Sequence, residues 1–301
     1  MIELKNEKIA IPVVLIAGLI WSFGPLVVRY MNEPNLVPWQ YIFGRGLTIF
    51  ILINFYLFFE EGLVFYKNYL KIGISGIIGG SGLGIAMITF MFSITNTSAA
   101  ITLLCLAVMP FFTALLGFLF LKERISLNVW IAILIATFGI VIIALGNTAK
   151  GSLLGLVFGM TSSIGFSVFS VSLRWRKETP KFTTVAFAGL FCFIFALIVL
   201  LKKDFPLLST SYNSALFSLH GILVCIGLIL YSIGSKAIPA AELTLLSLTE
   251  VIGGIFWVWL PLFGINEIPT TNTIIGGFFL FMSIIYYSLT IKTNRRFIAL
   301  N

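Results

Sequence analysis

The chain has 301 residues, of which 59% are hydrophobic and 10% are charged, and its mean hydropathy is +1.09. Soluble domains carry about 25% charged residues, so this composition excludes a water-soluble globular protein. The formal charge of +8 is not gathered into the basic face that nucleic-acid binding requires. The three cysteines lie far apart inside apolar runs, which argues against a disulfide framework or a metal site: Cys105, Cys192 and Cys225.

Ten apolar stretches follow one another along the chain, and a helix needs roughly 20 such residues to cross the hydrocarbon layer. Breaks at Pro, Asn, Gly and charge clusters place them at residues 9–30, 37–59, 69–93, 97–121, 127–146, 151–173, 183–201, 212–235, 239–262 and 270–291. The first stretch has no signal-peptide cleavage pattern, so we expect it to be retained. The prediction is an all-α integral membrane protein with ten transmembrane helices.

Basic residues are distributed unequally between the two sides of this topology. Fourteen of the 19 Lys and Arg residues lie at the termini and in the connections after spans 2, 4, 6 and 8, four lie on the other side, and Arg45 lies inside a span. Connections rich in Lys and Arg stay in the cytoplasm. We therefore expect a multi-pass protein of the cell (inner) membrane with both termini cytoplasmic.

Short sequence matches recur at offsets of 141 to 144 residues. The matches are ThrLeuLeu at 102–104 and 244–246, SerPheGly at 22–24 with SerIleGly at 163–165, and Glu123 with Glu267. A repeat of five spans is odd, so its second copy must enter the membrane from the opposite face, a construction common in secondary transporters. The sequence therefore predicts two inverted five-helix repeats, at residues 1–147 and 148–301.

The run SAAITLLCLAVMPFFTALLGFLFLKERI at 98–125, with Pro110 in mid-helix, resembles the fourth-span signature of the EamA-like family of the drug/metabolite transporter superfamily. Three later stretches are similar to the second repeat of that family: 240–251, 257–259 and 267–269. Val251 departs from the pattern, because many relatives have proline there. The resemblance implies that spans 1, 3, 4, 6, 8 and 9 surround a substrate cavity and that spans 5 and 10 are peripheral.

Glu250 stands near the middle of span 9, where an isolated acid costs roughly 2.5 to 3.5 kcal/mol on insertion scales. Helical spacing places Ser247, Gly253, Gly254 and Trp257 on its face. The glycines then leave a hollow beside the carboxylate, and a carboxylate near an indole suits an ammonium group. We predict that Glu250, Ser247 and Trp257 bind substrate and that the glycines form a hinge. The alternative is a protonated Glu250 that packs against a neighbouring helix.

Arg45 lies inside span 2 and needs a partner or water. It is predicted to hold a substrate carboxylate, to balance Glu250, or to cap the carbonyls of a broken helix. Ser163 and Ser167 lie on one face of span 6, and their hydroxyl groups either line a wet pathway or bond across helices. Together with Trp21 of span 1, these residues complete the predicted substrate-binding set.

Pro25 and Pro110 interrupt spans 1 and 4 and remove the hydrogen bonds to the carbonyls of Trp21 and Leu106, four residues earlier. Broken helices supply ligands and hinges in transporters. We therefore predict that both prolines mark hinge or gating positions, and a simple packing kink is the alternative.

The leading prediction is a secondary transporter that moves an amino acid, an amine or a related small metabolite across the bilayer by alternating access. We expect no cofactor, because no nucleotide-binding motif is present, so a coupling ion or an exchange substrate must drive concentrative transport. One alternative is an intramembrane serine protease, with Ser81 in GlyGlySerGly as the nucleophile and His220 as the base. Another is a passive channel.

Overall fold

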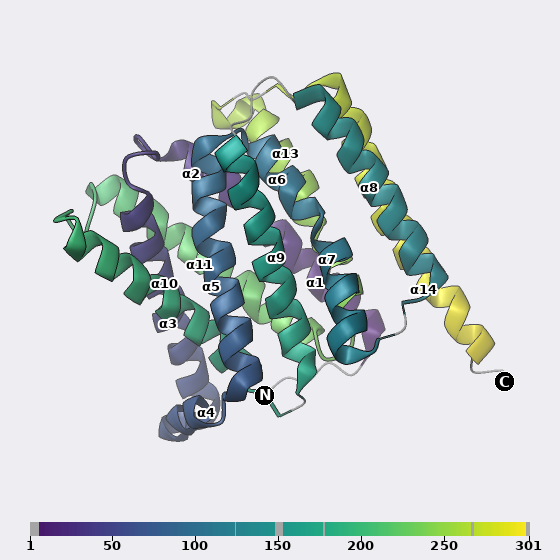
Figure 1. The fold of residues 1–301 in the computed structure, drawn as a ribbon, viewed down its shortest axis with the longest axis horizontal. Coiled ribbons are helices and arrows are strands. Elements are labelled where there is room, and N and C mark those ends of the chain that lie inside the picture. The colour runs from purple at the N-terminus through teal and green to yellow at the C-terminus, as the bar shows by residue number, and fades with distance from the viewer. Residues whose placement is uncertain (1–5, 124, 148–152, 177, 266–267, 299–301) are drawn as a thin grey trace.

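The computed structural model describes residues 6–123, 125–147, 153–176, 178–265 and 268–298. All regular structure in these ranges is helical (Figure 1). Within them, nine helical segments are long and apolar enough to span a membrane, and the shorter apolar helix Leu127–Ile142 lies at the fifth predicted span. The prediction of an all-α membrane protein with ten helices is confirmed.

The helices of the first half are α1 (Glu7–Trp21), α2 (Gly24–Tyr30), α3 (Pro38–Glu61), η1 (Gly62–Tyr66), α4 (Lys67–Leu70), α5 (Gly73–Asn96), α6 (Ala99–Ala107), α7 (Met109–Leu116), η2 (Gly117–Leu121) and α8 (Leu127–Asn147). Those of the second half are α9 (Leu153–Trp175), α10 (Lys181–Lys202), α11 (Ser211–Gly234), α12 (Ala240–Leu246), α13 (Thr249–Trp259), η3 (Pro261–Phe263) and α14 (Thr271–Ile298).

Three of the described spans are interrupted. Span 1 is divided into α1 and α2 just before Pro25, and span 4 is divided into α6 and α7 just before Pro110. Proline lacks the N–H group and clashes with the preceding turn, so both breaks occur where the sequence predicts them. Span 9 is divided into α12 and α13 at Ser247 and Leu248. This third break has no proline, and the sequence gives no local signal for it.

The helices pack in pairs that bring the two halves of the chain together. The most extensive pairs are α5 with α9, α3 with α10, α8 with α14, α5 with α10, and α1 with α11. Small residues allow close approach: a Cβ atom on Gly82 of α5 would lie 2.9 Å from the Gly165 carbonyl of α9, and one on Gly46 of α3 would lie 3.0 Å from the Gly189 carbonyl of α10. Figure 1 shows α8 and α14 together at one edge of the bundle.

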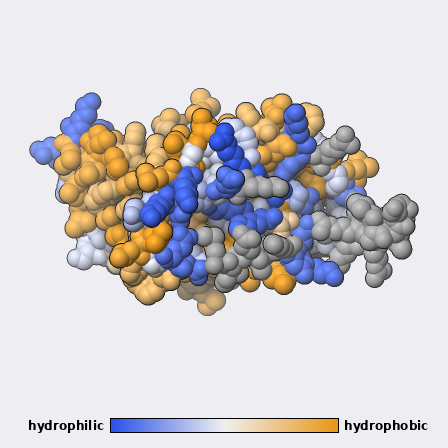
Figure 2. Space-filling model, turned by 90° about the horizontal axis from the view of Figure 1, so that it is seen from below, coloured by the Kyte–Doolittle hydropathy of each residue, from blue (hydrophilic) through white to orange (hydrophobic). Residues whose placement is uncertain are grey.

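The outward faces carry large apolar side chains, as a lipid-facing surface requires; examples are Ile16, Phe55, Leu134 and Phe278. Both termini lie at the lower end of the bundle in Figure 1. Figure 2 views this end and shows hydrophilic side chains gathered near its middle, with hydrophobic side chains beside them. The connections that follow spans 2, 4, 6 and 8 carry exposed basic residues, namely Lys67, Lys71, Lys122, Arg176 and Lys236.

Candidate functional site

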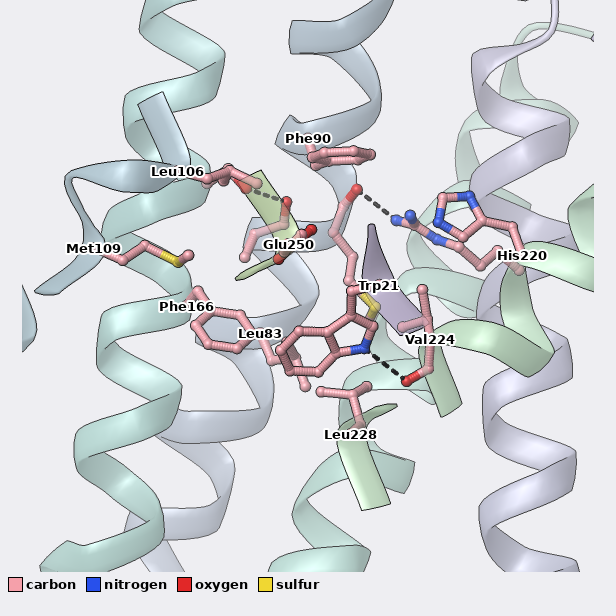
Figure 3. A pocket seen from close by; sticks show the side chains of 14 residues that line it. Trp21, Leu83, Phe90, Leu106, Met109, Phe166, His220, Val224, Leu228 and Glu250 are labelled. Atoms are coloured by element: carbon pink, nitrogen blue, oxygen red, sulfur yellow. Dashed lines mark hydrogen bonds between the residues drawn. The ribbon is translucent and has the colours of Figure 1, made fainter. Parts of the chain in front are cut away.

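A cavity of about 70 Å³ lies inside the bundle (Figure 3). Its walls come from α1, α3, α5, α6, α7, α9, α11 and α13. The lining residues are Trp21, Arg45, Leu83, Ala86, Met87, Phe90, Leu106, Met109, Ser162, Phe166, His220, Val224, Leu228 and Glu250. These helices belong to spans 1, 3, 4, 6, 8 and 9, which the resemblance implies as the cavity wall, and to span 2, which contributes Arg45. Ligand pockets usually measure about 300 to 1,000 Å³, so this cavity must widen to admit a metabolite.

Arg45 is buried in the wall of the cavity, with 3% of its surface exposed. Its Nη1 donates to the Tyr41 hydroxyl at 2.8 Å, and its Nη2 donates to the Met87 carbonyl at 2.6 Å. The guanidinium carbon also lies 4.7 Å from the centre of the Tyr41 ring. A guanidinium has five N–H donors, and the described residues take up two of them. Arg45 is therefore held by neutral groups, and its charge has no carboxylate partner in the described chain.

Glu250 reaches the same cavity from the first turn of α13. In Figure 3 its carboxyl group lies beside Leu106, on the opposite side of the cavity from His220. The break in span 9 places Glu250 in the first turn of a new helix, where the helix dipole favours a carboxylate, and the backbone N–H groups of Glu250, Val251 and Ile252 bond the carbonyls of Ser247 and Leu248. No ion pair of Glu250 occurs among the described residues.

Tyr41 is a member of the site that the sequence analysis missed. Its hydroxyl lies 2.5 Å from His220 Nδ1 and 2.8 Å from Arg45 Nη1, so it joins the two residues. Tyr41 is fully buried and its ring packs edge-on against Phe217, with 5.5 Å between the centroids. The available signal was the spacing of four residues between Tyr41 and Arg45, which places two helical side chains side by side.

Trp21 closes one side of the cavity at the end of α1. Its Nε1 donates to the Val224 carbonyl at 3.3 Å, and its ring meets that of Phe166 edge-on at 5.5 Å. A Cβ atom on Gly227 would lie 2.1 Å from Trp21 Nε1, so only glycine leaves room for the indole there. The structure places Trp21 in the cavity with Arg45 and Glu250.

The serines of α9 bond across helices. Ser163 Oγ donates to the Cys105 carbonyl, and Ser167 Oγ donates to the Met109 carbonyl at 3.2 Å. The Cys105 carbonyl belongs to the end of α6 and the Met109 carbonyl to the first residue of α7, so the two serine hydroxyls bond α9 to span 4 on both sides of its break. Neither side chain lines the cavity, whereas the neighbouring Ser162 does and donates to the Ala86 carbonyl at 2.9 Å.

The other predicted residues of span 9 lie away from the cavity lining. Trp257 Nε1 donates to Ser22 Oγ at 2.8 Å, and the Trp257 ring stacks on Phe23 with 4.6 Å between the centroids. Ser247 Oγ donates to the Thr244 carbonyl at the break. The two predicted hinge glycines, Gly253 and Gly254, lie inside the continuous helix α13. A Cβ atom on Gly253 would lie 2.6 Å from the Oγ of Ser22, which directly follows α1, and one on Gly254 would lie 2.8 Å from Leu103 Cδ1 of α6.

An ion pair joins the ends of several spans at the end of the bundle that carries the termini. Arg174 Nε donates to Glu123 Oε1 at 2.6 Å, and Arg174 Nη1 donates to the carbonyls of Ser235 at 3.0 Å and Ile238 at 2.8 Å. Glu123 Oε2 accepts from the Ala240 backbone N–H at 3.3 Å. This network, the Glu123–Arg174 latch, connects spans 4, 6, 8 and 9 below the cavity.

The protease alternative has little support in the geometry. His220 Nδ1 is occupied by Tyr41, and no hydrogen bond between Ser81 and His220 is recorded, although both residues are described. The glycines around Ser81 have a packing role: a Cβ atom on Gly79 would lie 1.8 Å from Ser172 Oγ. In the described residues no cluster of three or more His, Cys, Asp or Glu side chains could hold a metal ion.

A ten-helix bundle around an internal pocket that is lined by an arginine and a glutamate fits a multi-pass membrane transporter. Residues 8–145 match the EamA-like transporter family, so the resemblance to that family is confirmed over this part of the chain.

Proteins with sequences similar to this chain are named as transporters or exporters. A protein of Helicobacter pylori (strain J99), an "uncharacterized transporter", is 25% identical over 80% of each chain. The "pseudopaline exporter CntI" of Pseudomonas aeruginosa is 24% identical over 73% of this chain and 75% of that protein. A protein solved by crystallography, 16% identical, superposes with a TM-score of 0.74 over 96% of this chain and 99% of that one. At this identity the last likeness concerns the fold alone.

Proposed function

We propose that the protein is a secondary transporter for a small zwitterionic metabolite with an apolar body, such as an apolar amino acid. The observation that carries this proposal is that Arg45 and Glu250 line one otherwise largely apolar cavity without an ion-pair partner in the described chain. Buried charges without partners are strongly unfavourable. A ligand with one carboxylate and one ammonium group would compensate both, and its apolar part would pack among Trp21, Phe90 and Phe166.

The mechanism that we propose is alternating access between two inverted halves, residues 1–147 and 148–301. A twofold axis between the halves would exchange each span with the span five places away along the chain. This exchange converts the packed pair α5–α9 into α11–α1 and the pair α5–α10 into α11–α3. The pairs α3–α10 and α8–α14 convert into themselves. All of these pairs are in contact, as a twofold relationship requires.

Hydrogen bonds at the two ends support the same relationship. Arg29 Nη1 donates to the Ile94 carbonyl at the end of α5, and Arg174 Nη1 donates to the Ser235 carbonyl just after α11. Ile94 and Ser235 are 141 residues apart and Arg29 and Arg174 are 145 residues apart, close to the offsets of 141 to 144 residues between the sequence matches.

The breaks near Pro25 and Pro110 and at Ser247 are the positions where we expect the halves to bend. The Glu123–Arg174 latch would close the cavity toward the cytoplasm, because the excess of basic residues at this end favours a cytoplasmic location for both termini in the cell (inner) membrane. A coupling ion or an exchanged solute would supply the driving force. The exporter named among the relatives supports a carrier of metabolites.

The test is counterflow in liposomes that contain the purified protein. Vesicles preloaded with unlabelled L-leucine should accumulate external labelled L-leucine transiently, and the rate should saturate. A passive channel gives no trans-stimulation. Repeating the assay with the other apolar amino acids defines the preferred side chain, and failure of all of them to exchange would refute the proposed substrate class.

A further inference from the structure

Tyr41 hydrogen-bonds both Arg45 and His220, and no other residue in the described part of the chain does so. All three side chains are buried, with exposures of 0%, 3% and 3%. The tyrosine oxygen therefore lies between a permanently charged donor and an imidazole nitrogen. Arg45 and His220 line the cavity, whereas Tyr41 lies behind them. Tyr41 thus contacts the cavity wall without forming part of it.

The donor rules fix the proton positions in this chain. Arginine can only donate, so the Arg45 Nη1–H bond uses the Tyr41 oxygen as acceptor. The described residues offer the phenolic proton no acceptor other than His220 Nδ1, so we assign this nitrogen as the acceptor of a neutral imidazole. A neutral imidazole carries one N–H group, so the remaining proton belongs on His220 Nε2.

His220 Nε2 lies at the break of span 1. A Cβ atom on Gly24, the first residue of α2, would be 2.7 Å from this nitrogen, so glycine is what leaves the space open. The described residues supply no hydrogen-bond acceptor for Nε2. The imidazole, which belongs to a residue that lines the cavity, therefore has an N–H donor next to Gly24 that the described residues do not use.

We propose that Tyr41 is a positioning residue of a carboxylate subsite formed by Arg45 and His220. Its hydroxyl holds the guanidinium at the cavity wall and sets His220 in the Nε2–H form, so that a substrate carboxylate receives donors from both residues. The inference rests on the proposed function, because it assumes that the ligand carries a carboxylate. It adds Tyr41 and His220 as determinants of specificity for acids over amines.

The test compares L-leucine with isoamylamine, the amine that remains when the carboxylate of leucine is removed. Tyr41→Phe keeps the ring against Phe217 and removes only the hydroxyl. We expect the Kd of L-leucine to rise about tenfold and the Kd of isoamylamine to change less than twofold. Tyr231→Phe is the matched control, because Tyr231 is equally buried but its hydroxyl bonds Ser170, 2.7 Å away; it should preserve the ratio of the two affinities.

A double-mutant cycle separates positioning from general damage. In an Arg45→Gln background, Tyr41→Phe should have a smaller effect on the affinity ratio, because one of the two groups that it positions is gone. If Tyr41→Phe does not fold, His220 decides the matter: Gln can place an N–H near the Nε2 position and Asn cannot, so His220→Gln should bind L-leucine more tightly than His220→Asn. Equal losses in these two variants would overturn the inference.

The outcomes also distinguish this inference from the proposed function. If wild type binds none of the apolar amino acids, or binds L-leucine and isoamylamine equally, the zwitterion proposal itself fails. If wild type prefers L-leucine and Tyr41→Phe keeps the full preference, only the role of Tyr41 is refuted.

Discussion

Arg45 of α3 and Glu250 of α13 face one cavity from opposite halves of the chain, and no ion pair joins them or neutralises either within the described residues. Two opposite charges that close on each other would form a structural ion pair. Held apart, the guanidinium and an ionised Glu250 would form the dipole that the proposed zwitterionic ligand complements. Because the two side chains are separate, substitution of each one tests whether the site selects a carboxylate or an ammonium group on the substrate.

Glu250→Gln should abolish exchange of L-leucine while the protein remains inserted and folded, because the amide keeps the shape of the side chain and removes the charge that would bind an ammonium group. Counterflow in liposomes measures transport, and thermal unfolding in detergent checks folding. Glu242→Gln is the control, since Glu242 lies on the same span but outside the cavity lining. Full exchange by Glu250→Gln would exclude this carboxylate from binding.

Arg45→Gln should weaken L-leucine binding by about tenfold to a hundredfold and leave isoamylamine binding nearly unchanged. The lost charge-assisted hydrogen bonds are worth ~1.5 to 3 kcal/mol. Isothermal titration with the two compounds measures the difference directly. Equal losses for both ligands would mean that Arg45 supports the fold through Tyr41 and Met87 instead of reading a carboxylate.

Glu123→Gln should open the end of the cavity that the latch closes. The pair is partly exposed, with 21% of the Glu123 and 26% of the Arg174 side chain accessible, so we expect a shift of roughly 1 kcal/mol, about fivefold in the ratio of closed to open molecules. A cysteine introduced at Leu106 should react about fivefold faster with an impermeant thiol reagent applied from that end. Glu178→Gln removes an exposed acid elsewhere and should have no effect; an unchanged rate in Glu123→Gln would exclude a gating role.

Topology is tested with single cysteines in a background in which Cys105, Cys192 and Cys225 are replaced by alanine. Leu208 follows α10 and Glu178 precedes it, and both side chains are exposed. In intact cells, a cysteine at 208 should react with an impermeant reagent, whereas one at 178 should react only after permeabilisation. The reverse pattern would place the termini outside.

Gly82→Ala should lower the thermal stability. The new Cβ atom would meet the Gly165 carbonyl at 2.9 Å and Val168 Cγ1 at 3.0 Å, and overpacking of this kind costs roughly 1 to 3 kcal/mol. Gly277→Ala in α14 is the control, because nothing lies within 4 Å of its Cβ position. A melting temperature of Gly82→Ala as high as that of the control would show that α5 and α9 can separate without loss.

Local chemistry was sufficient to predict much of this molecule. Hydropathy located the spans, because a helix in lipid must be apolar along its length. The prolines located two breaks, because a missing N–H group acts on its own turn. Arg45 and Glu250 were identified because a charge within a span requires a specific reason.

Only the tertiary structure decided which side chains share the cavity. Trp257 lies on the predicted face of span 9, yet its indole N–H donates to Ser22. The hydroxyl groups of Ser163 and Ser167 donate to carbonyls beside the break in span 4. Tyr41 connects Arg45 to His220 across the bundle. Sequence spacing fixes the face of a helix on which a residue lies. Packing between segments far apart in the chain sets the rotation of that helix against its neighbours, and it also decides whether the helix is interrupted, as at Ser247. Each residue turns the helix by about 100°, so a small rotation changes the neighbour that a side chain meets.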